Sequence, residues 1–126
     1  MNVSVRKQID AGGTLTAGFV IAGATSRTVL IRAIGPGLAA FGLTGVMADP
    51  QLALFSGAVR ITGNDNWGGD TQITAAGTAV GAFAIANTAS RDAMLITTLA
   101  PGSYTVEVSG VGGSAGETLV EIYEVP

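Results

Sequence analysis

The stretch from Met47 to Asp70, MADPQLALFSGAVRITGNDNWGGD, decides the fold class. Leu52 and Leu54 alternate with residues of other kinds, as in a strand that buries one face. Ser56-Gly57 then supplies a tight turn before a second apolar strand at Val59 to Ile61. The stretch therefore predicts a β-hairpin between two acidic loops.

The rest of the chain continues this pattern of short strands separated by Gly, Pro and Asn turns. Arg27 to Ile34 carries the strongest strand signal, with Val29 and Ile31 on one face and Leu30 and Arg32 on the other. It predicts a central strand that is covered on both faces. Further strands are expected at 3–9, 14–22, 93–99, 103–109 and 118–125.

Helix signals are weak by comparison. Leu38 to Leu43 can form one helical turn, and the segment 71–86 predicts either a short helix or a lid loop, because its internal glycines disfavour helix. Gly110 to Gly116 predicts a flexible hairpin loop. About eight short strands with at most one short helix predict a single all-β domain over residues 1–126, an antiparallel β-sandwich of the jelly-roll kind.

Composition excludes several functions. Only 12% of residues are charged, against about 25% in typical domains, so Ala, Gly, Ser and Thr must cover much of the surface. A net charge of −3 with six scattered Lys and Arg argues against nucleic-acid binding. The longest apolar run, Ala17 to Ala24, is too short for membrane insertion, and residues 1–7 lack the apolar core of a signal peptide.

The chain has no histidine and no cysteine, which rules out the usual catalytic triads and zinc sites. The acidic residues of the predicted strands have no evident catalytic partner, so we expect no enzyme activity and no required cofactor. For Arg32 and Glu121, a cross-strand pair inside the sheet is the favoured interpretation.

The loop NDNWGGD at 64–70 is more polar than a turn requires, and three interpretations stay open. It is an Asx-turn cluster with Trp67 packed over the sandwich edge, a calcium site built from carboxylate and amide oxygens, or a carbohydrate site with Trp67 as a stacking platform.

Several segments together resemble a known family. The segments are VLIRAIGPGLAAFGLTGVMADPQLALF (29–55), NDNW (64–67), AMLITTLAPGSYTVEVSGVGG (93–113) and LVEIYEV (119–125). In this order they resemble the β-sandwich modules that are repeated or C-terminal in large secreted bacterial proteins, which are similar to bacterial pre-peptidase C-terminal domains. The resemblance implies an extracellular or cell-surface, non-catalytic module. It also implies calcium ligands at Asp49, Asn64, Asp65 and Asn66.

The leading functional hypothesis is a self-associating building block of an extracellular filament, matrix or surface assembly. The N-terminal strand begins almost at the chain start, and Arg6 and Lys7 are unusual in so uncharged a chain, so we expect this strand to carry subunit contacts. The expected interface residues are Val3, Val5, Arg6, Lys7, Glu121 and Glu124, with the two glutamates as the electrostatic match. The alternative is an accessory calcium- or carbohydrate-binding module of a secreted enzyme.

Overall fold

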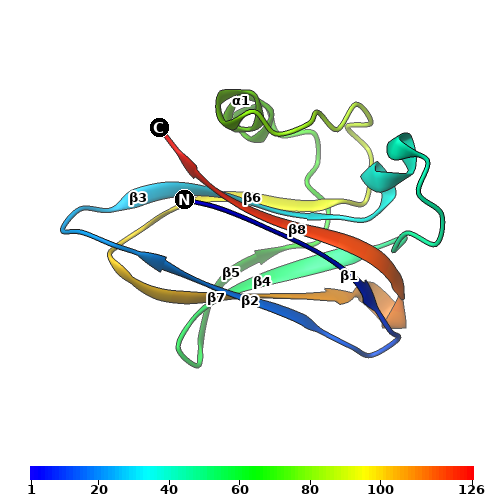
Figure 1. Cartoon of the computed structure of the whole chain (residues 1–126), viewed down its shortest axis with the longest axis horizontal. Coiled ribbons are helices and arrows are strands. Elements are labelled where there is room, and N and C mark those ends of the chain that lie inside the picture. Colours follow the sequence, from blue (N-terminus) through cyan, green and yellow to red (C-terminus); the bar gives the residue numbers. More distant parts are fainter.

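The computed structural model describes residues 1–126 as two four-stranded antiparallel sheets that form a β-sandwich (Figure 1). Sheet A has the order β1 (Asn2–Ile9), β8 (Gly116–Val125), β3 (Arg27–Ile34), β6 (Ala93–Leu99). Sheet B has the order β2 (Leu15–Ile21), β7 (Gly102–Gly110), β4 (Pro50–Ser56), β5 (Val59–Asn64). The predicted fold class is confirmed.

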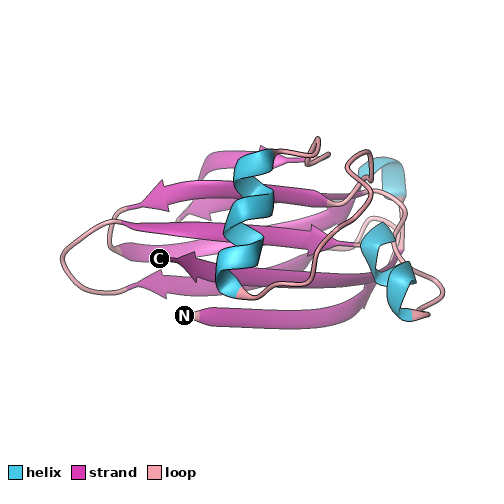
Figure 2. Ribbon diagram, turned by 90° about the horizontal axis from the view of Figure 1, so that it is seen from above, coloured by secondary structure: helices cyan, strands magenta, loops and turns pink.

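Three helical segments complete the chain: η1 (Pro36–Phe41), α1 (Thr71–Val80) and η2 (Val111–Gly113). Asp70 caps α1 by accepting a hydrogen bond from the Gln72 amide at 2.8 Å, and Gly81 ends the helix with a φ of 75°. Figure 2 shows α1 lying across the strands of the sandwich. None of the helices has the length and apolar character that a membrane span needs.

Most consecutive strands lie in different sheets, and β4–β5 is the one hairpin between chain neighbours. Its Ser56 and Val59 pair across a short turn, where Gly57 has a φ of 60°. The prediction of a hairpin loop at 110–116 is wrong, because β7 lies in sheet B and β8 lies in sheet A. This segment, with η2, is a crossover between the layers.

Strand β3 is central and buried on both faces, as predicted. Val29, Ile31 and Ala33 belong to the main core between the sheets, which contains 17 buried residues. Leu30 and Ile34 belong to a second core of eight buried residues, which also includes residues of α1. One strand therefore serves two apolar layers, and its alternation assigns each side chain to one of them.

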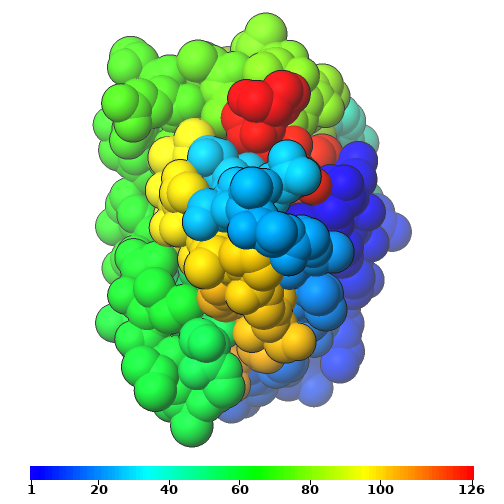
Figure 3. Space-filling view, turned by 90° about the vertical axis from the view of Figure 1, so that its left-hand side faces the viewer, coloured from blue at the N-terminus to red at the C-terminus, as the bar shows by residue number.

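The apolar residues of the second hairpin strand are exposed. Val59 is 68% exposed and Ile61 is 44% exposed, and neither residue belongs to an apolar core. Strand β1 is the edge of sheet A, and most of its residues are exposed. The space-filling view shows the N-terminal segment in blue along one side of the molecule and the green residues after 50 along the other (Figure 3).

The predicted pair between Arg32 and Glu121 is confirmed. These residues are directly opposed on β3 and β8, and Arg32 Nε lies 3.0 Å from Glu121 Oε1. Glu121 Oε2 accepts a 2.6 Å hydrogen bond from the Tyr123 hydroxyl. Burial lowers the pKa of Arg32, with Glu121 acting in the opposite direction, and burial together with the bond to Glu121 raises the pKa of Tyr123 to about 12.

Replacing Glu121 with alanine leaves a buried guanidinium without its carboxylate, a change that costs about 3–5 kcal/mol in other proteins. We expect Glu121→Ala to lower the free energy of unfolding by about this amount in urea denaturation. The double variant Arg32→Met/Glu121→Leu removes both charges and should recover most of the loss. A double variant as unstable as the single one would contradict this explanation.

Candidate cation site

The structure brings two of the four predicted calcium ligands together. Asp49 immediately precedes β4 and Asp65 immediately follows β5, so the antiparallel pairing of these strands places both residues at one end of the hairpin. Each carboxylate has a buried Oδ1 atom that lacks a hydrogen-bond partner. Burial raises the pKa of Asp65, and the neighbouring Asp49 carboxyl raises it further.

The positive charge beside this pair comes from Arg91, whose Nη1 lies 3.7 Å from Asp49 Oδ2. Its side chain is 68% exposed, so the ion pair is strongly screened by water. When both carboxylates are ionised, the exposed Arg91 does not balance their combined negative charge. Such a pair can hold a cation or share a proton.

The two predicted amide ligands have other roles. Asn64 Oδ1 accepts a 3.0 Å hydrogen bond from the Met94 amide, and Asn64 Nδ2 donates a 3.1 Å bond to the Asn66 carbonyl. Asn64 thus joins the end of β5 to the edge strand β6. The Asn66 side chain is exposed. No group of three or more His, Cys, Asp or Glu side chains forms a larger metal cluster, so the candidate is a two-carboxylate site.

Trp67 is not an exposed stacking platform. Only 6% of the residue is exposed, its indole Nε1 donates a 3.1 Å hydrogen bond to Ser90 Oγ, and the ring belongs to the second core. Its backbone amide donates to the Asp92 carbonyl at 3.1 Å. The carbohydrate interpretation that used Trp67 is therefore wrong, because packing under the loops has removed the ring face from solvent.

Asp92 is a key residue that the sequence did not single out. It is fully buried, and its Oδ1 accepts hydrogen bonds from the amides of Gly35 and Gly37 at 2.8 and 3.1 Å. Its Oδ2 accepts a 2.7 Å bond from the Ser90 hydroxyl. A side chain at Gly35 would collide with the Met47 carbonyl oxygen, which explains the glycine. The sequence did contain a signal for this role, because Asp92 directly precedes the apolar strand β6 and buried acids need partners.

Asp92→Ala removes the acceptor of three hydrogen bonds from a buried site, and bonds to charged groups contribute about 1.5–3 kcal/mol each. We expect a loss of about 3 kcal/mol or more in the free energy of unfolding. The sole tryptophan, Trp67, should report the loosened loop as a red shift of its fluorescence. Asp10→Ala, in an exposed turn, is the control. Unchanged stability and emission in Asp92→Ala would contradict this role.

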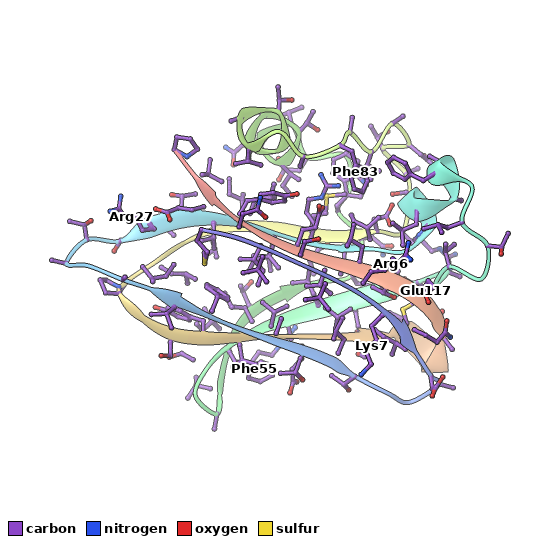
Figure 4. All side chains as sticks on the ribbon, in the orientation of Figure 1. Arg6, Lys7, Arg27, Phe55, Phe83 and Glu117 are labelled. Atoms are coloured by element: carbon purple, nitrogen blue, oxygen red, sulfur yellow. The ribbon has the colours of Figure 1, made fainter.

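Arg6 in the N-terminal strand pairs with a glutamate other than the two expected, Glu121 and Glu124. Arg6 Nε lies 3.7 Å from Glu117 Oε2 within the same chain (Figure 4). Glu124 pairs with the N-terminal amine and with Arg27, at 3.6 and 3.4 Å. Glu121 is 5% exposed and belongs to the Arg32 pair, so its assignment to an interface is wrong. Strand β1 itself pairs with β8 of its own chain from Asn2 to Ile9.

Comparisons with known proteins give a fold. No protein-family model and no curated protein matches this sequence. The pre-peptidase C-terminal domain of a collagenase from Bacillus anthracis is similar with a TM-score of 0.59 at 11% identity, over 98% of this chain and 90% of that one. The Yersinia pseudotuberculosis-derived mitogen has a TM-score of 0.53 at 11% identity, over 100% of this chain and 86% of that one.

The fold is similar to that of a pre-peptidase C-terminal domain. A CBM35 module of Abf62 from Cellvibrio japonicus also matches, with a TM-score of 0.47 at 13% identity over 94% of this chain and 68% of that one. The similarity to the collagenase domain confirms, at the level of fold, the resemblance inferred from the sequence. The chain is a β-sandwich whose fold resembles that of the collagenase domain.

Proposed function

We propose that this chain is a non-catalytic, extracellular accessory module of a secreted bacterial protein, and that Asp49 and Asp65 bind a calcium ion. The similarity to the collagenase domain supports the accessory-module alternative better than a self-assembling building block. The single observation that carries the calcium proposal is the pair of carboxylates, each with a buried oxygen that lacks a partner.

Calcium fits the chemistry of this pair. It takes 6–8 oxygen ligands in flexible geometry, and it accepts carboxylates, backbone carbonyls and water together. Two carboxylates supply the charge, and the loop residues beside them, Ala48 and Asn66, are exposed to water. Sites of few charged ligands bind calcium weakly, at dissociation constants on the order of 10⁻⁴–10⁻³ M in extracellular modules. The ion would join the loop before β4 to the loop after β5.

Calcium should reverse the effect of a substitution at Asp65. Because the pKa of Asp65 is raised on folding, the folded state holds its proton more tightly, and stability is lost as pH rises through the folded pKa. In chelator at neutral pH, Asp65→Asn should therefore raise the melting temperature. With calcium at 100 times its dissociation constant, the original chain should gain about 2.7 kcal/mol, and the variant should gain almost nothing.

The controls separate a site from a general salt effect. Asp10→Asn removes an exposed carboxylate far along the chain and should keep the full calcium response. Magnesium, which demands stricter octahedral geometry, should stabilise less than calcium at the same concentration. An original chain whose melting temperature is the same in calcium and in chelator would refute the calcium site.

Self-association through β1 is the second candidate, and one observation favours it. The strand is exposed along most of its length, and its outer edge offers unpaired backbone groups to a neighbour. Deletion of residues 1–8 should then abolish the assembly that the full chain forms, measured by light scattering at rising concentration. A full chain that stays monomeric throughout would contradict this candidate.

A further inference from the structure

A cavity of about 70 Å³ lies under α1, between the helix, the segment 82–85 and the outer face of sheet A. Its walls are mainly apolar, and they include Trp67, Ile73, Phe83, Ile85 and Met94. Arg32 is the one charged residue that lines it. This site shares neither Asp49 nor Asp65 with the proposed calcium site.

The guanidinium of Arg32 is only partly satisfied. Nη1 donates a 2.8 Å hydrogen bond to the Phe83 carbonyl, and the group lies over the Phe83 ring at 4.5 Å from its centroid. Nε faces Glu121 Oε1 at 3.0 Å. Nε and Nη2 are both buried and form no hydrogen bond, and the side chain is only 3% exposed. Buried donors are thus left over on a residue that lines an apolar cavity, and a buried donor without a hydrogen bond is costly.

We propose that this cavity binds the neutral, oxygen-bearing end of a small organic molecule, such as a primary amide or an alcohol, whose oxygen accepts a hydrogen bond from Arg32 Nη2. The short apolar part of the ligand packs against the aromatic and aliphatic walls. Apolar pockets with a few convergent polar groups are typical ligand sites.

Charge selects a neutral ligand. The Arg32 cation is already balanced by Glu121, and Asp92 adds a second nearby negative charge. A carboxylate ligand would therefore enter a buried site without a free cation to balance it. A carbonyl or hydroxyl oxygen satisfies Nη2 at no such cost.

Size and polarity also restrict the occupant. A volume of about 70 Å³ admits only a small occupant. Water needs two to four polar partners, and the hydroxyls of Thr74 and Thr78 can only accept from it, because they donate to the Asp70 and Thr74 carbonyls at 3.3 and 3.2 Å. A small molecule with one polar end and one apolar end matches these walls better than water does.

Acetamide and acetate form a matched pair of probes, because they have nearly the same shape and differ in charge. In titrations followed by ¹H–¹⁵N NMR, acetamide should give saturable shifts of Arg32 Nε and of the amides of α1, with a dissociation constant on the order of millimolar for so small a ligand. Acetate should bind at least tenfold more weakly.

Gly77→Ala tests the site without weakening the fold. Its added methyl group would lie 3.8 Å from Arg32 Nη1, on the cavity wall, and alanine favours the helix over glycine. This variant should bind acetamide at least tenfold more weakly. Gln72→Ala, on the exposed face of the same helix, is the control and should bind normally.

The double variant Arg32→Met/Glu121→Gln removes the donor and keeps a partner for Tyr123, and it should lose the preference for acetamide over acetate. The absence of saturable shifts with acetamide would overturn the proposal, since the cavity would then hold only water. Equal binding of both probes by the original chain, or full binding by Gly77→Ala, would overturn it as well. Calcium binding at Asp49 and Asp65 is unaffected by either result.

Discussion

The two-sided burial of β3 is the constraint on which the rest of this structure depends. A strand with apolar residues on both faces needs a cover on each, and sheet B supplies one cover while α1 and its flanking loops supply the other. The single charge on the buried part of that strand, Arg32, then needs a partner from inside the molecule. Glu121 on the adjacent strand provides it, which fixes the register between β3 and β8.

The cover over sheet A has little regular structure, so hydrogen bonds rather than a helix bundle hold it in place. Asp92 binds the loop after β3 through the amides of Gly35 and Gly37, and its backbone carbonyl binds the loop that carries Trp67. Asn64 joins β5 to β6 across the open side of the sandwich. These polar contacts also satisfy backbone groups that would otherwise be orphaned at a sheet edge.

The sequence predicted features whose signal is local. The alternation in Arg27–Ile34 identified a central strand, and the lone charges Arg32 and Glu121 pointed to each other because buried charges need partners. The sequence does not show which sheet a strand joins, because strands alternate in the same way on either side of a hairpin or a crossover. The prediction of a hairpin loop at Gly110 to Gly116 was wrong for this reason. The burial of Trp67 depends on Ser90, which is 23 residues away in sequence, and no local pattern records that contact.

The same logic identifies what is unusual about Asp49 and Asp65. This chain uses charge sparingly, at 12% of its residues, and the acids in its strands are mostly placed beside a cation, as Glu117, Glu121 and Glu124 are. Asp92 has three hydrogen-bond donors instead. Asp49 and Asp65 instead adjoin each other, and their cation is the largely exposed Arg91. The buried acids Glu121 and Asp92 have their partners inside the molecule, whereas the charge of Asp49 and Asp65 is balanced by an exposed cation.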